Sequence, residues 1–324
     1  GRDIPGALAG KTWVEVGGIK QGLFRRSESP ENPGILFLHG GAGSQELPMA
    51  AAAEEEGGER LEKYFTVVHW DQRGAGMTAK TKTDPATMTV EQLMEDTLAV
   101  TDYLRQRFGQ EKILLMGHSW GSYLGTKVVQ AHPDRYRAYV GIGQISNQLE
   151  SEKRAHAYML SHAREIGDQK AVKALEAVDV NASDFPSQSY LRGPRSKYMN
   201  EYGIGMMRKD ASMASVAMQI LRFDGYTVGE KFAYLGGMDR SQKYLFDRVT
   251  EEDFFAGDLS FEVPFYVAHG RYDYQVSQHL AEEYVAAISA PAKGFTYFED
   301  SAHSPNFEEM DDFVAFVRQI DERH

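Results

Sequence analysis

Short apolar runs that alternate with amphipathic stretches constrain the fold of this chain more than any other feature of its sequence. The runs at 34–40, 65–71, 112–117 and 136–143 are rich in apolar residues, and several end in glycine. Such runs are typical of strands that are buried on both faces of a sheet. Because helical stretches separate them, we expect a mostly parallel central sheet with helices on both faces.

The regions around these strands also carry local structural signals. Residues 12–26 contain two β-rich runs separated by a glycine pair, which predicts an antiparallel hairpin. Residues 47–63 predict a helix with an acidic exposed face. Thr89 and Gln92 form a capping-box pattern, which predicts a long amphipathic helix that extends to about Phe108.

The alternation of strands and helices stops in the middle of the chain and then resumes. Residues 146–258 contain no clear buried strand and are rich in helix formers, methionine and tyrosine. Strand patterns return at 263–270 and 294–300, each followed by a helical stretch. We therefore expect an α/β domain in two parts, 1–145 and 259–324, with the intervening residues inserted as a helical cap.

Composition excludes several classes of function. The net charge of −12 argues against a nucleic-acid partner, because phosphate binding requires clustered lysine and arginine. The absence of cysteine excludes disulfides, a thiol nucleophile, zinc–thiolate sites and iron–sulfur clusters. No phosphate-binding loop, dinucleotide fingerprint or metal-ligand cluster is visible, so we expect neither a cofactor nor a metal.

The sequence also lacks the run of about 18 apolar residues that a membrane-spanning helix requires. We expect a cytoplasmic protein that has no membrane span. Because the sequence starts at Gly1 rather than Met, export after removal of a signal peptide stays an alternative. The oligomeric state is left open.

One predicted strand leads into a motif with chemical meaning. Residues 117–121 read Gly-His-Ser-Trp-Gly between a buried strand and a helix. In this context G-x-S-x-G predicts a sharp turn that exposes the Ser119 hydroxyl at the carboxyl edge of the sheet. The flanking Gly117 and Gly121 are small because the turn crowds the backbone. Ser119 is therefore our candidate nucleophile.

A serine nucleophile needs a base and a group that orients the base. Asp273 follows one late strand and His303 follows the next, one strand–helix–strand unit further on. This gives the chain order serine, acid, histidine that the motif requires. Asp258 is a fallback acid. We expect the neighbouring His118 to be a packed residue rather than the base.

Acyl transfer also needs hydrogen-bond donors for the oxyanion that forms on the substrate. The backbone N–H of Trp120, the residue after the nucleophile, is one candidate donor. The second is the N–H of Gly41, with that of Ala42 as the alternative, in the stretch "HGGAGS" (39–44), which follows the first parallel strand. Glycines there allow the backbone to approach a substrate carbonyl closely.

Three stretches carry a family resemblance: "HGGAGS", "DQRGAGMT" (71–78) and "GHSWGSYLG" (117–125). On these motifs the chain resembles the α/β-hydrolase fold family, and within it the proline iminopeptidase-like branch. The resemblance implies that Ser119 is the nucleophile, His303 the base and Asp273 its orienter, beneath a helical cap. It also implies that Asp71 and Arg73 form a structural pair beside the oxyanion loop.

The chain departs from this branch at two places. Ala42 stands where the family has proline in the oxyanion loop, and the W-x-x-W-E motif of the cap is absent. In the family, the glutamate of that motif receives the free amino group of the substrate. Glu201 in "KYMNEYG" and Glu230 are candidates for that part here, and surface charges are the alternative for both.

The cap also supplies candidate residues for an apolar substrate pocket. Tyr198, Tyr202, Met206 and Met207 offer adaptable apolar surface, although packing of the cap's own core is the alternative role for them. We expect a small-molecule or short-peptide substrate.

The sequence therefore predicts a serine hydrolase that cleaves an amide or ester bond through an acyl-enzyme. We favour a proline iminopeptidase-like aminopeptidase that acts on short peptides. A carboxylesterase or lactonase is the alternative within the hydrolases. A ligand-binding receptor without turnover is the alternative from another class, because fold does not dictate function.

Overall fold

The computed structural model of the protein describes residues 8–55, 57–209 and 211–324. An eight-stranded sheet with the order β1-β2-β4-β3-β5-β6-β7-β8 forms its centre. The strands are β1 (Leu8–Val16), β2 (Ile19–Ser27), β3 (Gly34–Leu38), β4 (Thr66–Asp71), β5 (Ile113–His118), β6 (Tyr136–Ile142), β7 (Phe265–Gly270) and β8 (Lys293–Phe298).

Strand pairing follows the sequence pattern closely. β1 and β2 form the predicted antiparallel hairpin, and β2 pairs antiparallel with β4. All remaining pairs, from β4 through β3 to β8, are parallel. The six strands predicted from apolar runs are therefore confirmed, and the carboxyl ends of the parallel strands share one edge of the sheet.

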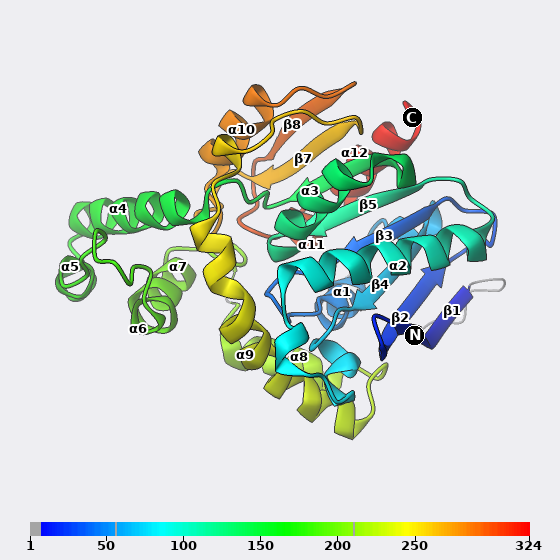
Figure 1. Cartoon of the computed structure of the whole chain (residues 1–324). Helices are drawn as coiled ribbons and strands as arrows, with labels where there is room; N and C mark the ends of the chain where they lie inside the picture. Colours follow the sequence, from blue (N-terminus) through cyan, green and yellow to red (C-terminus); the bar gives the residue numbers. More distant parts are fainter. Residues whose placement is uncertain (1–7, 56, 210) are drawn as a thin grey trace.

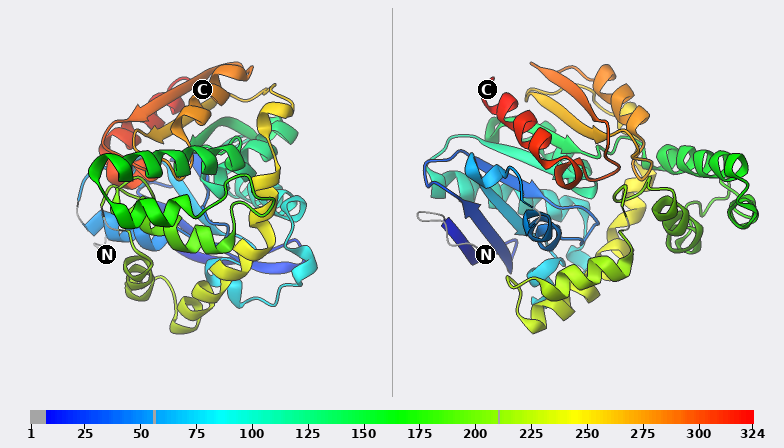
Figure 2. Two further views of the ribbon diagram at one scale, coloured as in Figure 1. Left: turned by 90° about the vertical axis from the view of Figure 1, so that its left-hand side faces the viewer. Right: turned by 180° about the vertical axis from the view of Figure 1, so that it is seen from behind.

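Helices cover both faces of the sheet (Figures 1 and 2). On one face lie α2 (Val90–Phe108), α3 (Trp120–Ala131) and α10 (Gln278–Ala287), and on the other lies α12 (Met310–Asp321). The smaller helices of the two sheet-forming regions are α1 (Leu47–Glu55), α11 (Pro305–Glu308) and the 3-10 turns η1 (Leu61–Lys63), η2 (Gly76–Lys80), η3 (Pro85–Thr87) and η4 (Pro133–Arg135).

The core lies in two layers because successive strand residues point to opposite faces. In β3, Leu36 belongs to the cluster beneath α2 and α3, whereas Ile35 belongs to the cluster beneath α12. Leu115 and Leu114 of β5 divide in the same way. All four side chains are fully buried, which is why the apolar runs are continuous rather than alternating.

Two of the local predictions can be compared with the structure directly. Thr89 caps α2, because its side-chain oxygen accepts a hydrogen bond from the Gln92 backbone N–H at 3.1 Å. The helix predicted over 47–63 is wrong in its second half, since α1 ends at Glu55. Gly57 and Gly58 have φ values of 87° and 115°, a left-handed backbone that does not continue a helix.

Between β6 and β7 the described chain is helical, as the sequence indicates. In Figure 1 the helices α4 to α7 extend away from the sheet, while α8 and α9 pass along its lower side and return the chain to β7. These elements are α4 (Gln148–Ile166), α5 (Gln169–Glu176), α6 (Gln188–Tyr190), η5 (Leu191–Arg195), α7 (Ser196–Glu201), α8 (Met213–Arg222), α9 (Val228–Glu251) and η6 (Phe254–Ala256). None of the described helices combines the length and the apolar composition that a membrane-spanning segment requires.

Candidate active site

Ser119 lies on a strained turn between β5 and α3. It has φ 55° and ψ −117°, and it is the only non-glycine residue with positive φ among the described residues. A Cβ atom on Gly117 would lie 2.2 Å from the Gly121 carbonyl oxygen, and one on Gly121 would lie 2.0 Å from the Leu38 carbonyl oxygen. The turn therefore requires glycine two residues before and two residues after the serine.

Asp273 and His303 meet at the same edge of the sheet. Asp273 follows β7 and His303 follows β8, and both side chains are fully buried. His303 Nδ1 donates a hydrogen bond to Asp273 Oδ2 at 2.7 Å. The other carboxylate oxygen of Asp273 accepts a bond from the Val276 backbone N–H at 2.9 Å. The structure thus brings together the acid and the histidine that the sequence singled out.

Burial disfavours ionisation of Asp273, but two histidines outweigh it. His303 and His269, whose Nε2 lies 3.0 Å from Asp273 Oδ2, hold the pKa of this carboxyl well below its usual range. For His303, burial is the stronger of the two effects on the pKa. Its burial outweighs the attraction of Asp273 and lowers the pKa of the imidazole below its ordinary value. A neutral imidazole beside an ionised carboxylate is the state that a general base requires.

The remaining ring nitrogen of His303 is available for proton transfer. Nε2 is buried and has no hydrogen-bond partner among the described residues. The imidazole lies against the end of β6, since a Cβ atom on Gly143 would be 2.6 Å from His303 Cε1. The preceding residue, Ile142, accepts a hydrogen bond from the Ser119 backbone N–H at 2.9 Å. The serine and the imidazole therefore flank the same strand end.

The glycine loop after β3 lies next to the serine. A Cβ atom on Gly40 would be 3.5 Å from Ser119 Cβ, and Gly41 has φ 120°. The Gly41–Ala42 peptide bond, at the place of the family's proline, is cis. Trp120 begins α3, so its backbone N–H has no acceptor within the helix. Both predicted oxyanion donors thus belong to backbone segments beside Ser119.

The predicted substrate-binding residues of the cap are scattered. Tyr198 is buried in an apolar cluster of the cap, and the Tyr202 hydroxyl donates to Asp168 at 3.2 Å. Both tyrosines therefore pack within the cap itself. Met206 differs, because its Sδ accepts a hydrogen bond at 3.2 Å from the hydroxyl of Ser304, the residue after His303.

Both glutamates that were candidates to receive the amino group of a substrate have a cationic neighbour in the structure. Glu201 is exposed on α7, and its carboxylate lies 3.9 Å from Lys197 Nζ. Glu230 forms an ion pair with Lys11 at 2.6 Å and completes the capping box of α9 with Thr227. The structure thus gives both carboxylates other partners.

The expected pair of Asp71 and Arg73 is wrong. Arg73 instead forms two hydrogen bonds with Asp96 of α2, at 2.8 and 3.0 Å, with both side chains buried. Asp71 accepts bonds from Gln45 Nε2 and from the Tyr226 hydroxyl. The packing of α2 places the Asp96 carboxylate directly against Arg73, while Asp71 has other donors.

Two charged contacts near the site have no counterpart in the sequence prediction. His269 is buried, as expected of a core residue, yet it also contacts Asp273. Because His269 lies in β7 and Asp273 in the turn that follows it, no local pattern in the sequence indicates this contact. His118 is buried and pairs with Glu46, which follows the glycine loop.

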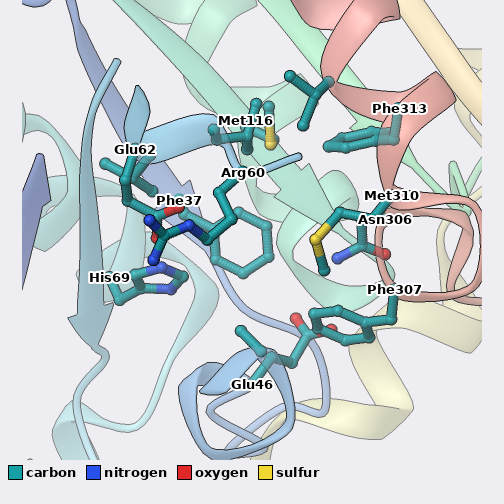
Figure 3. Close-up of a pocket in the computed structure, with 14 residues that line it drawn as sticks. Phe37, Glu46, Arg60, Glu62, His69, Met116, Asn306, Phe307, Met310 and Phe313 are labelled. Atoms are coloured by element: carbon teal, nitrogen blue, oxygen red, sulfur yellow. The ribbon is translucent and has the colours of Figure 1, made fainter. Parts of the chain in front are cut away.

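A separate pocket lies on the α12 side of the sheet (Figure 3). Its walls include Phe37, Met116 and Phe313. The empty volume of the whole pocket is about 540 Å³, which includes the solvent space at its open side. None of the predicted catalytic residues lines it. The described residues also contain no group of three histidine or acidic side chains arranged to hold a metal ion.

The fold and this arrangement of residues agree with comparisons to known proteins. The profile of the alpha/beta hydrolase fold matches residues 33–310. The chain belongs to the α/β-hydrolase fold family, and the predicted fold class is confirmed.

Individual relatives extend the resemblance to the proline iminopeptidase-like branch. A Bacillus subtilis (strain 168) protein named "Probable aminopeptidase YbaC" is 32% identical over 312 residues, which span 96% of each chain. The proline iminopeptidase of Neisseria gonorrhoeae is 31% identical over 128 residues, 40% of this chain and 38% of that protein. The crystal structure of the Mycobacterium smegmatis proline iminopeptidase has a TM-score of 0.64 at 18% identity, covering 97% of this chain and 98% of that chain.

Proposed function

We propose that this protein is a serine hydrolase in which Ser119 is the nucleophile, His303 the general base and Asp273 the residue that orients the base. The observation that carries the proposal is the 2.7 Å hydrogen bond between His303 Nδ1 and Asp273. It fixes the tautomer of the imidazole and leaves the buried Nε2 without a partner. The strained backbone of Ser119 supports its role, because such strain concentrates at functional residues.

The proposed reaction has two steps. Ser119 Oγ attacks the substrate carbonyl while its proton passes to His303 Nε2, and the imidazolium then gives this proton to the leaving amine or alcohol. Water, deprotonated by the same nitrogen, attacks the acyl-enzyme, and the proton returns to Ser119 as the acid leaves. The backbone N–H groups of Gly41 and Trp120 stabilise the oxyanion in both steps.

We propose residues 146–258 as the cap of this site. Contacts beside the base support this assignment. The His303 backbone N–H donates to the Gly205 carbonyl at 3.0 Å, and the Tyr274 N–H donates to the Ile204 carbonyl at 3.0 Å. Met206, which follows Gly205, then offers the flexible apolar surface of the substrate site. We propose no such role for Tyr198 and Tyr202.

The substrate that we favour is a short peptide with a free amino terminus. The 32% identity to a probable aminopeptidase along nearly the whole chain supports this choice. A carboxylesterase or lactonase is the second candidate, and the ion pairs of Glu201 and Glu230 favour it, since both carboxylates already have cationic partners. An ester substrate needs no carboxylate to receive an amino group.

Two measurements test these proposals in turn. A fluorophosphonate probe should label the wild-type protein and fail to label Ser119→Ala, while the matched control Ser187→Ala, at the start of α6 in the cap, should label normally. Labelling that persists in Ser119→Ala would reject the nucleophile. Proline and alanine aminoacyl reporters, compared with acyl-ester reporters, then distinguish the substrates, and turnover of esters alone would reject the aminopeptidase.

A protein that takes no label but binds a ligand would instead support the receptor alternative. That outcome would reject turnover at Ser119 altogether. Equilibrium binding of the same reporters, measured with Ser119→Ala, provides the comparison.

A further inference from the structure

A second histidine is buried directly beside the proposed base. The ring of His118, the residue before the nucleophile, lies 4.7 Å from the ring of His303, centroid to centroid. His118 Nε2 lies 2.6 Å from the backbone carbonyl oxygen of His303. Its Nδ1 contacts the Glu46 carboxylate, and the side chains of His118 and Glu46 are 1% and 2% exposed. The proposed reaction uses neither residue.

The two partners of this ring determine where its protons lie. A backbone carbonyl oxygen only accepts hydrogen bonds, and so does an ionised carboxylate. With the Glu46 carboxylate ionised, both ring nitrogens must donate for both contacts to be hydrogen bonds, and His118 is then an imidazolium. Burial opposes this charge, but the Glu46 carboxylate outweighs it and raises the pKa of His118 above its ordinary value.

Glu46 connects this histidine with the glycine loop. One of its oxygens contacts His118, and the other accepts a hydrogen bond from the Gly40 backbone N–H at 3.0 Å. A continuous series of hydrogen bonds therefore runs from the loop of Gly41, through Glu46 and His118, to the backbone of His303. It connects the segment that holds the oxyanion with the segment that holds the base.

We propose that Glu46 and His118 form a buried carboxylate–imidazolium pair that positions His303 against the oxyanion loop and holds a positive charge beside the base. Both are positioning residues rather than catalytic ones, because they act through His303 and Gly40. The effect on the reaction rests on the proposed function, whereas the protonation of His118 does not.

The charges of His118 and Glu46 are screened only weakly, because both side chains are buried. The side chains of His118 and Glu46 are 1% and 2% exposed. Glu46 also lines the pocket of Figure 3, whose other ionisable lining residues are Arg60, Glu62 and His69. Buried charges are screened far less than exposed ones.

Several other ionisable groups act on the two histidines and on Glu46. The field of Asp273 reaches both histidines, and that of His269 reaches His303. Buried His39 and Tyr234 lie within the field of Glu46. Among these groups His118 and His269 lower the pKa of His303, while Asp273 raises it. Loss of the His118 charge is therefore expected to raise the pKa of the base.

The first test reads the protonation of His118 without any turnover. Nitrogen-15 NMR of histidine-labelled protein, assigned by the signal missing in His118→Gln, should show both ring nitrogens of His118 protonated at pH 7 and over the pH range in which the protein is folded. In Glu46→Gln the same ring should become neutral within this range. A neutral His118 ring in the wild-type protein at pH 7 would overturn the proposal.

The second test reads the effect on the base. The rate of fluorophosphonate labelling of Ser119 is measured against pH for Glu46→Gln, His118→Gln and the double variant. We expect each single variant to be slowed by up to about 100-fold at neutral pH. The acidic limb of the profile should move to higher pH by about one unit. The double variant should be no slower than the slower single variant, because the pair acts as a unit.

A purely structural role would slow labelling without moving the acidic limb, so an unmoved limb in the folded variants overturns the positioning role. His156→Asn is the matched control, since His156 is a buried histidine of the cap that bonds the Leu175 carbonyl at 2.9 Å. Its profile should match the wild-type profile. If His118→Gln fails to fold, the acidic limb of the pH profile of Glu46→Gln decides whether the positioning role holds. If wild-type Ser119 takes no label, the proposed function fails and the NMR result alone decides this inference.

Discussion

The carboxyl edge of the sheet and the helical region 146–258, our proposed cap, hold their side chains in different ways. At the sheet edge the turn at Ser119 requires glycine at 117 and 121, and a Cβ atom on Gly143 would lie too close to His303. In the cap, Tyr198 and Tyr202 pack among neighbouring cap residues, and Glu201 is exposed. The proposed catalytic residues thus lie where the backbone restricts the residue type, whereas the cap residues predicted to bind substrate lie among ordinary packing contacts or at the surface.

This difference indicates which mutations should matter. A change at the sheet edge removes or displaces an atom of the proposed catalytic residues. A comparable change in the cap alters packing or a surface charge. Matched substitutions in the two regions therefore test the comparison directly.

The largest effect is expected for Asp273→Asn. The amide no longer fixes the His303 tautomer, and its NH₂ group can face the Nδ1–H that the carboxylate accepted, so kcat should fall by about 10⁴-fold. The matched cap variant is Asp168→Asn, at the N-cap of α5, where asparagine caps nearly as well. Its kcat should be unchanged in the same ester and aminoacyl assays. A fall in kcat of less than tenfold in Asp273→Asn would contradict the proposed difference between the sheet edge and the cap.

A pair of glycines provides a sharper test. Gly143 and Gly167 have φ values of 55° and 76°, so alanine should cost each about 1–2 kcal/mol of stability. At Gly143 the new Cβ would also lie 2.6 Å from His303 Cε1, whereas at Gly167 nothing lies within 4 Å. We expect kcat to fall by about 100-fold in Gly143→Ala alone. Urea unfolding measures the stability of both variants. Equal kcat values for Gly143→Ala and Gly167→Ala would contradict this prediction.

The same division explains what the sequence could predict. The strands, the turn at Ser119 and the order of Asp273 and His303 follow from short patterns that depend on local residues. These patterns gave the sheet and the candidate catalytic residues. Where a local signal was overlooked, as at Gly57 and Gly58 within the helix predicted over 47–63, the prediction was wrong.

Contacts between distant residues were harder to predict. Glu46 and His118 are 72 residues apart, and nothing in either local sequence identifies the other. Arg73 pairs with Asp96 rather than Asp71 because the packing of α2 places that carboxylate nearby. In the cap, amphipathic helices have several possible packing partners. The sequence alone therefore did not decide whether Tyr198 and Tyr202 line a substrate pocket or pack in the core of the cap.

A smaller effect is expected where the two regions touch. The Tyr226 hydroxyl, in the loop between α8 and α9, donates to buried Asp71 at 2.8 Å. Burial, opposed by the bonds from Met77, Tyr226 and Gln45, raises the pKa of Asp71 from 3.8 to about 7. The folded state therefore keeps this proton where the unfolded chain has lost it. The contribution of Asp71 to stability is full below about pH 4 and is lost as the pH rises through about 7.

Asp71→Asn removes this titration. The urea midpoint of the wild-type protein should fall more steeply between pH 4 and 8 than that of the variant. Parallel pH dependences would show that Asp71 is ionised throughout and that the cap contact does not depend on pH in this range.

The smallest effect is expected for Glu201→Gln. The carboxylate is exposed and 3.9 Å from Lys197, and a surface pair of this kind contributes less than about 1 kcal/mol. The KM for proline and alanine aminoacyl reporters should therefore change by less than about fivefold. Glu230→Gln is the matched control, since it removes the charge that pairs with Lys11, keeps a side-chain acceptor for the capping box of α9, and should lower stability without raising KM. If Glu201→Gln raises KM tenfold for aminoacyl reporters and leaves esters unaffected, the cap must rearrange to bring this carboxylate to the substrate. The cap would then be as specific a part of the site as the sheet edge.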